Sequence, residues 1–233
     1  MPDRVLVVMA HPDDVDFGAA GTVAAWTDEG LDVIYCIVTD GEAGGSDRAV
    51  GRTDMAALRR EEQTAAAKVL GVTELHFLGH PDGRVQPTIE LRRDISRVIR
   101  AVQPQRLLTQ SPERNFERIY ASHPDHLATG EAALCAVYPD ARNPFAHPEL
   151  LTEGLEPWVV PEVWMMVGTA HNTWVDVTET FERKVDALRA HSSQTSHMDN
   201  LAEFLKGWGE AQAKAGGLPE GRLAEGFRVI QTG

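Results

Sequence analysis

The sequence has almost no cysteine. Only Cys36 and Cys135 occur among its 233 residues, and each lies in an apolar segment. Two cysteines are too few for a disulfide framework of several bridges. We therefore expect two buried free thiols, which act in the fold as small apolar side chains.

Long hydrophobic runs and net positive charge are also missing. No apolar stretch is long enough to span a bilayer. The first apolar segment begins at Val5, which leaves no room for the charged region and cleavage site of a signal peptide. The formal net charge of −13 excludes nucleic acid and anionic membrane surfaces as general partners. These absences predict a cytoplasmic protein without a membrane span.

No repeat, low-complexity tract or composition shift divides the chain, so we expect one domain over residues 1–233. Short apolar runs alternate with segments of helical periodicity, which indicates a mostly parallel sheet with right-handed crossovers. The predicted fold is therefore α/β, a Rossmann-like three-layer αβα sandwich. Strands are predicted near residues 5–10, 31–38, 75–78, 106–109, 163–167, 173–177 and 226–231, and helices near 19–29, 54–70, 88–102, 124–138, 178–190 and 201–215. A glycine-rich mobile loop is expected over 41–51 and an irregular surface excursion over 139–160, and the roles of both segments are left open.

Polar residues follow each of the first four predicted strands. They are His11-Pro12-Asp13-Asp14, Thr39-Asp40-Gly41, His80-Pro81-Asp82-Gly83 and Gln110-Ser111-Pro112. The carboxyl ends of parallel strands share one edge of the sheet, and ligands bind there near the switch in strand order. We therefore expect the chemistry of this protein at that edge.

His11 and Asp14 are suited to bind a catalytic divalent metal. A hydrolytic zinc site uses three protein ligands from His, Asp or Glu and leaves one position for water. His11 and Asp14 supply two ligands from one loop, and the third must come from elsewhere. The segment His123-Pro124-Asp125-His126 is the best source, because residues three apart share one face of a helix.

These motifs resemble the PIG-L (LmbE-like) family of zinc-dependent N-deacetylases, which includes deacetylases of mycothiol and bacillithiol precursors. The likeness covers most of the chain, apart from residues 139–160 and the C-terminal helix. Further matches are Thr39-Asp40-Gly41-Glu42, Arg59, Glu62, Leu70-Gly71-Val72, Pro81-Asp82-Gly83, Asp176-Val177-Thr178, Lys184 and His191-Ser192-Ser193-Gln194.

The resemblance implies a role for each residue of the two main motifs. Zinc, with Fe²⁺ as the alternative, would be held by His11, Asp14 and His126. Asp13 would be the general base. His123 would protonate the leaving amine or steady the oxyanion, and Asp125 would orient His123.

The resemblance also implies that Arg59 and Asp82 contact the substrate. One position departs from the family pattern. The mycothiol-precursor deacetylases have a tyrosine two positions before the histidine that matches His123, whereas this chain has Ala121 there and Tyr120 one residue earlier. The sequence therefore gives no support for a tyrosine oxyanion donor.

Each of these residues also has a purely structural interpretation. The His11 loop could be a solvated turn, with Asp16 complementing the dipole of the following helix. His123 could be a surface or capping residue. Arg59 and Glu62 are spaced for a surface ion pair on one helix, Asp82-Gly83 is a normal turn pair, and His191 fits a packed helix end.

The favoured function is a metal-dependent hydrolase that removes an N-acetyl or short N-acyl group from a small molecule, an amino-sugar conjugate or related amide. An amidase that cuts a larger N-acyl group or a thiol conjugate is the alternative within the same class. A nucleotide-binding Rossmann protein is the alternative of another class. It would need Gly-x-Gly-x-x-Gly after the first strand, where His11-Pro12-Asp13-Asp14 stands instead. The substrate's identity and the oligomeric state are left open, a homo-oligomer included.

Overall fold

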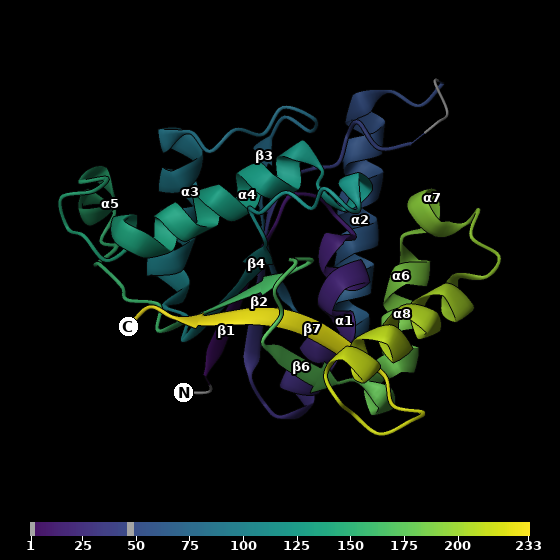
Figure 1. Ribbon diagram of the computed structural model, residues 1–233. Helices are drawn as coiled ribbons and strands as arrows, with labels where there is room; N and C mark the ends of the chain where they lie inside the picture. Colours follow the sequence, from purple (N-terminus) through teal and green to yellow (C-terminus); the bar gives the residue numbers. More distant parts are fainter. Residues whose placement is uncertain (1–2, 46–48) are drawn as a thin grey trace.

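A single seven-stranded sheet runs through the computed structural model, which describes residues 3–45 and 49–233 (Figure 1). The strand order is β3-β2-β1-β4-β5-β7-β6. The first five strands in this order pair in parallel, whereas β7 pairs antiparallel with β5 and β6. The predicted mostly parallel sheet is confirmed. The strands are β1 (Arg4–Met9), β2 (Asp32–Thr39), β3 (Glu74–His80), β4 (Arg106–Gln110), β5 (Glu162–Met166), β6 (Thr173–Asp176) and β7 (Ala224–Gln231).

Helices cover both faces of the sheet. Helices α3 and α4 lie on one side, and α1, α2 and α6 lie on the other (Figure 1). This arrangement confirms the predicted three-layer α/β fold. The main helices are α1 (Asp14–Asp28), α2 (Arg52–Val69), α3 (Ile89–Val102), α4 (Pro124–Cys135), α6 (Phe181–Ala190) and α8 (Leu201–Ala215), and the short ones are α5 (Glu149–Thr152) and α7 (Ser192–Thr195).

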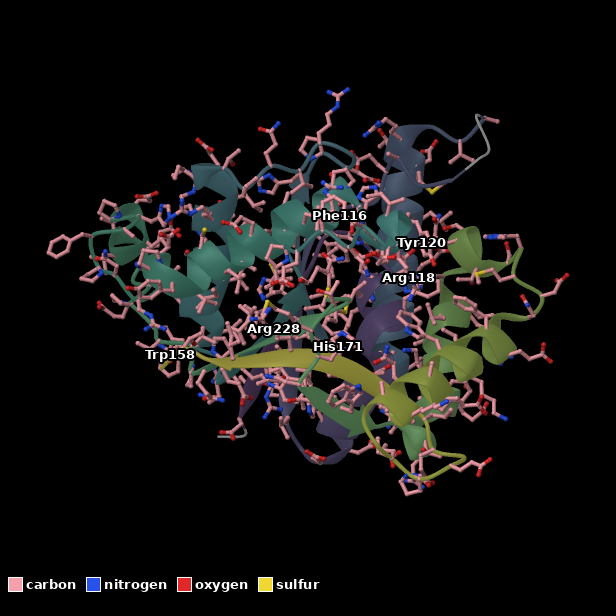
Figure 2. The ribbon with its side chains drawn as sticks, viewed as in Figure 1. Phe116, Arg118, Tyr120, Trp158, His171 and Arg228 are labelled. Carbon is pink, nitrogen blue, oxygen red and sulfur yellow. The ribbon has the colours of Figure 1, made fainter. Side chains whose placement is uncertain are left out.

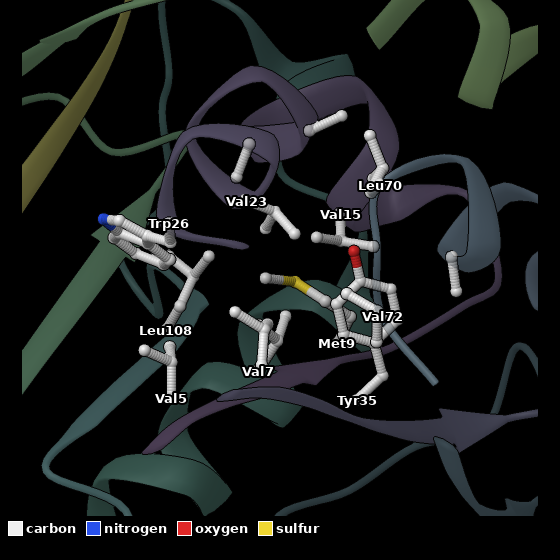
Figure 3. Packing of buried hydrophobic residues seen from close by; sticks show 14 of the residues in the cluster. Val5, Val7, Met9, Val15, Val23, Trp26, Tyr35, Leu70, Val72 and Leu108 are labelled. Carbon is white, nitrogen blue, oxygen red and sulfur yellow. The ribbon is translucent and has the colours of Figure 1, made fainter. Parts of the chain in front are cut away.

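Strand β1 lies at the centre of the core and is apolar on both faces. Val5, Val7 and Met9 pack against the α1 and α2 side (Figure 3), whereas Leu6 and Val8 pack against the α3 and α4 side. All five are at most 1% exposed. Burial of each such side chain is worth about 1.5–3 kcal/mol. The continuous apolar run is therefore explained by a parallel strand covered on both faces.

Several element boundaries differ from the prediction. Helix α1 begins at Asp14, five residues earlier than predicted, because the carbonyl of Asp13 accepts the first helical hydrogen bonds. Thr178 does not cap α6, contrary to the prediction from the sequence. A 3₁₀ turn over Thr178–Thr180 precedes this helix, and its N-cap is Thr180. Helix α4 ends at Cys135, and a π-helical turn over Ala136–Asp140 follows it directly.

The remaining expectations about the chain have mixed outcomes. Cys36 and Cys135 are both free, and Cys36 is buried whereas Cys135 is half-buried. The predicted excursion over 139–160 contains the short helix α5. Residues 46–48 of the predicted mobile loop lie outside the described residues, so its mobility stays a prediction. In the described part of the chain, no helix is long and apolar enough to cross a membrane.

Candidate metal centre and its cavity

The loop after β1 folds back on itself at Asp13. Its φ of 88° places this residue in the left-handed region, which Asp tolerates better than most residues. The backbone N–H of Asp13 donates to Oε1 of Gln63 at 2.8 Å, and this bond holds the turn against α2. The turn brings Asp14 back to the preceding loop, where its Oδ2 accepts a 2.7 Å hydrogen bond from the backbone N–H of His11.

Three donor side chains converge beside this turn. His11 Nδ1 lies 3.3 Å from Asp14 Oδ2 and 3.2 Å from His126 Nε2. His126 Nε2 lies 2.9 Å from Asp14 Oδ1. Ligands of a tetrahedral zinc ion, with bonds of about 2.1 Å, are about 3.4 Å apart. The donor set of His11, Asp14 and His126, called the metal triad below, therefore fits a divalent metal in both chemistry and spacing.

Carboxylates on the far side of His11 fix its orientation. His11 Nε2 lies 3.1 Å from Asp82 Oδ1 and 3.3 Å from Asp125 Oδ2. Burial by itself would lower the pKa of His11, but the charge of Asp14 and hydrogen bonds to Asp125, Asp14 and Asp82 raise that pKa to about 12. Metal-binding histidines commonly donate their second ring N–H to a carboxylate in this way.

The Asp125 carboxylate contacts His11, whereas the family resemblance implies that it orients His123. The Asp125 carboxylate accepts hydrogen bonds from the backbone N–H groups of Gly83 and Val85 and contacts His11. His123 is contacted instead by the backbone N–H of Asp125. The Asp125 side chain thus faces His11, and its backbone N–H faces the capping residue His123. Asp82 likewise contacts His11 and accepts from the Ala43 N–H.

His123 lies beside the triad on the open side. It is the N-cap of α4 and is exposed. Its ring centroid is 4.9 Å from that of His11 and 5.1 Å from that of His126. Partial burial and the positive charges of these two neighbours lower its pKa. The structure thus brings both histidines of the second motif to His11, as the sequence predicted.

The Asp13 carboxylate is not part of the triad and pairs with Arg59. Arg59 Nη2 donates to Asp13 Oδ2 at 2.8 Å and to the Pro12 carbonyl, and Nη1 donates to the Gly41 carbonyl. Burial and the charge of Asp14 raise the pKa of Asp13, whereas the charge of Arg59 lowers it. The resulting pKa is about 6. A carboxylate near this pKa can take up and release a proton close to neutral pH.

The alternative structural interpretation of Arg59 and Glu62 as a surface ion pair is wrong. Both residues are buried, at 4% and 6% exposure. Glu62 accepts hydrogen bonds from the hydroxyl groups of Ser192 and Ser193 instead. Helix α2 turns this face toward α7 and the His11 loop, so it is not a solvated face. Contact of Arg59 with a substrate stays a prediction.

A second His–Asp group behind the turn was missed by the sequence analysis. His191 Nε2 lies 2.8 Å from Asp16 Oδ2, and both side chains are fully buried. Gln63 joins this pair to the site, since its Nε2 donates to Asp16 Oδ2 while its Oε1 accepts from the Asp13 N–H. The position of Asp16 one turn beyond Asp13 on α1 was the available signal, but nothing in the sequence places His191 next to it.

A cavity of about 390 Å³ opens from the metal triad toward α8. Asp14 and His126 line its inner end, together with Gln110 at the end of β4. Gln110 Oε1 accepts the Ala10 N–H, whereas its Nε2 is buried without a partner among the described residues. The outer wall comes from α8, which the sequence analysis had left outside the family likeness.

Comparison with known proteins agrees with this geometry. Residues 6–137 match the model of the PIG-L family, GlcNAc-PI de-N-acetylase. The diacetylchitobiose deacetylase of Thermococcus kodakarensis is 33% identical over 97% of this chain and 83% of its own length. A probable N-acetyl-alpha-D-glucosaminyl L-malate deacetylase of Bacillus cereus is 32% identical over 85% of this chain and 86% of its own.

Solved structures show the same architecture. The N,N'-diacetylchitobiose deacetylase of Pyrococcus horikoshii, in complex with an inhibitor, superposes with a TM-score of 0.89 at 31% identity, over 98% of this chain and 84% of that one. A 4-carboxy-2-hydroxymuconate hydratase of Pseudomonas putida superposes at 0.79 with 22% identity, over 98% of this chain and 96% of that one. The second likeness concerns the fold alone.

Proposed function

Because this chain belongs to the PIG-L family of de-N-acetylases, we propose that it is a metal-dependent hydrolase that removes an N-acetyl or short N-acyl group from an amino-sugar conjugate. The observation that carries the proposal is the convergence of His11, Asp14 and His126 beside a carboxylate, Asp13, that is not part of the triad. The two relatives named above, a diacetylchitobiose deacetylase and a probable N-acetyl-alpha-D-glucosaminyl L-malate deacetylase, support an amino-sugar substrate. We take residues 1–233 as one deacetylase domain.

The metal triad would hold zinc, with Fe²⁺ as the alternative ion, since imidazole and carboxylate donors suit both. When bound, the metal would polarise the amide carbonyl and lower the pKa of a water molecule at the site. Asp82 and Asp125 would keep the ligand His11 in the tautomer that presents Nδ1 to the ion, because both accept from Nε2.

Asp13 and His123 would carry the two proton transfers. Asp13 takes a proton from the attacking water, whose oxygen forms the new bond to the carbonyl carbon. Arg59 keeps the Asp13 carboxylate in place through its 2.8 Å contact. His123 gives a proton to the amide nitrogen as the carbon–nitrogen bond breaks, so that acetate and a free amine leave. Each such transfer is typically worth about a hundredfold or more in rate.

Other residues of the loop act by position. Gln63 fixes the Asp13 backbone and is itself fixed by Asp16. Asp82 is 7% exposed, and its carboxylate contacts His11 and accepts the Ala43 N–H, so its main role is to orient His11. Contact of Asp82 with a substrate stays a prediction. We propose a cytoplasmic location from the net negative charge and because no helix in the described residues could cross a membrane.

The proposal is tested by an assay of free-amine release. The metal-loaded protein is incubated with a panel of N-acetylated sugars and conjugates, with and without a chelator. We expect release from at least one amino-sugar conjugate, its loss with chelator and its return when zinc is restored. If amine release were unaffected by chelation, or if no N-acyl sugar were cleaved, the proposal would be wrong.

A further inference from the structure

The cavity beside the metal triad is far larger than an acetyl group requires. It holds about 390 Å³, whereas a methyl group is about the size of a water molecule, whose share of liquid volume is about 30 Å³. It begins at Asp14 and His126 and reaches Phe204 and Trp208 of α8. An acetyl group by itself would fill only a small part of this space.

The wall of the cavity is mainly apolar. Its side chains include Phe17, Met166, Met198, Phe204 and Trp208. Methionine and aromatic side chains adapt to apolar groups of varied shape. Polar side chains such as Gln110, Asn115 and Gln212 also line the cavity, but most of the exposed surface of its wall is apolar, which favours a largely apolar occupant.

Few charged side chains line the cavity. Asp14 belongs to the metal triad, and Arg118 lies against the ring of Tyr120 (Figure 2). Away from the triad, Arg118 is therefore the only Asp, Glu, Lys or Arg side chain among the described residues that line the cavity. His171 lines the wall and burial lowers its pKa, which favours its neutral form.

The residue that follows β5 has a strained backbone conformation. Val167 lines the cavity and has a φ of 60°, a left-handed conformation that costs an L-residue about 1–2 kcal/mol. β-branched residues rarely adopt it. Strain of this kind is concentrated at ligand and active sites, where the surrounding structure holds it in place. It is an observation independent of the size of the cavity.

The position of the proton donor identifies the part of the substrate that enters. The scissile carbonyl belongs at the metal triad, and its nitrogen must face His123. Asp14 and His126 line the cavity, but Asp13 and His123 are not among the described residues that do. The direction left for the cavity is the third substituent of the carbonyl carbon, the acyl chain.

We propose that this cavity binds the acyl chain of the substrate, and that the preferred chain is apolar and longer than acetyl. The inference rests on the proposed function and specifies its substrate class. The bond that breaks is still the amide bond, so the products are a free amino sugar and a medium-chain carboxylic acid.

The test is a series of glucosamine derivatives that carry acetyl, butanoyl, hexanoyl or octanoyl on nitrogen. We expect kcat/KM of the metal-loaded enzyme to rise by about fourfold for each methylene that the cavity buries. A matched series keeps N-acetyl and lengthens the alkyl glycoside at the anomeric oxygen, and we expect it to stay flat. Rates that are highest with acetyl, or a rise in the glycoside series instead, would overturn the inference and leave the deacetylase proposal standing.

A binding measurement separates the cavity from turnover. We expect octanohydroxamate to inhibit more strongly than acetohydroxamate, and octanoate to change the fluorescence of the metal-free protein through Trp208, with Trp208→Phe as the reference. If no sugar derivative is cleaved but this chain-length dependence holds, the inference stands and the amino-sugar substrate fails. If neither ligand pair shows a chain-length dependence, the inference is overturned.

Variants localise the effect. Phe204 is half exposed, so Phe204→Ala is expected to fold. It should reduce the ratio of octanoyl to acetyl kcat/KM by about tenfold, because an aromatic wall is lost. Phe145→Ala removes an aromatic side chain that is 87% exposed in the 139–160 segment and should leave the ratio unchanged. Equal ratios in the wild type and Phe204→Ala, with Trp208→Ala also unchanged, would contradict the assignment.

Discussion

Two groups of histidine and aspartate lie on either side of the turn at Asp13, and they differ in charge balance. The metal triad has a carboxylate and two imidazoles, with two more carboxylates, Asp82 and Asp125, against His11. The group behind the turn, called the buried pair below, is Asp16 with His191. It is neutral as a whole when His191 is protonated. The first group has an excess of negative charge that a cation would offset, and the second has none.

Exposure separates the two groups further. The side chains of Asp16 and His191 are fully buried, whereas His126 is 24% exposed and opens on the cavity. A metal and its substrate need that access, and a structural pair does not. Under the proposed function, the same two residue types would hold a metal in one group and stabilise the fold in the other, according to the number of carboxylates and the access of solvent.

The largest expected effect is the loss of the metal itself. His126→Ala removes one of three donors, so we expect a metal-free protein without amine-release activity. Metal content per chain is measured by elemental analysis after dialysis. His76→Ala, at a half-buried histidine on β3 that pairs with Glu74, is the control and should keep the metal. A fully loaded His126→Ala protein would remove this residue from the triad.

Removal of the base should leave the metal in place. Asp13→Asn keeps the size of the side chain and its place outside the triad, so we expect near-normal metal content and a fall in kcat of about a hundredfold or more. Asp28→Asn, on the exposed end of α1, serves as the control. Loss of metal from Asp13→Asn would instead make Asp13 a ligand.

The buried pair should respond in the opposite way, with a change in stability and little change in metal content. His191→Gln leaves Asp16 without its ionic partner, which costs about 3–5 kcal/mol in the free energy of unfolding. Chemical denaturation of the metal-free protein measures this cost, with the exposed His197→Gln as the control. A small cost, together with loss of metal, would assign His191 to the metal centre.

The pH dependence of that cost has a definite sign. Burial would lower the pKa of His191, but the hydrogen bond to Asp16 and its charge raise the pKa above 6.5. The stability contributed by the proton is therefore fully present below pH 6.5 and is lost as the pH rises through the pKa in the folded protein. We expect the difference between the wild type and His191→Gln to shrink at alkaline pH. A difference that grows with pH would contradict the protonated pair.

The smallest effect concerns the support of the metal triad. Asp82→Asn removes one of the two carboxylates on His11 Nε2, and we expect metal affinity to fall by about 10–100-fold. Competition with a chelator measures the affinity. Asp125 still accepts from His11 in this variant, so the triad should bind metal at saturation. If affinity is unchanged but KM rises, Asp82 acts on the substrate, as the family resemblance implies.

The local pattern of the chain was sufficient for the order of the elements and for the edge of the sheet at which the candidate site lies. The apolar run of β1 predicts a strand buried on both faces, and the polar residues after the strands predict the active edge of the sheet. His11 and Asp14 come from one loop, so their proximity follows from short-range geometry alone. The motif His123-Pro124-Asp125-His126 offered two histidines, and the choice of His126 as the third ligand came from the family resemblance and stays a prediction.

Only the tertiary structure decided which carboxylate contacts which histidine. Asp125 serves His11 because α4 docks with that side chain facing β1, a result of helix packing and not of sequence spacing. Arg59, Gln63 and His191 reach the Asp13 turn from α2 and from the end of α6, and no periodicity of the chain encodes these encounters. The wall of the cavity likewise depends on where α8 lies. Sequence determines local conformation and the available chemistry, whereas contacts between distant segments depend on how whole faces pack against one another.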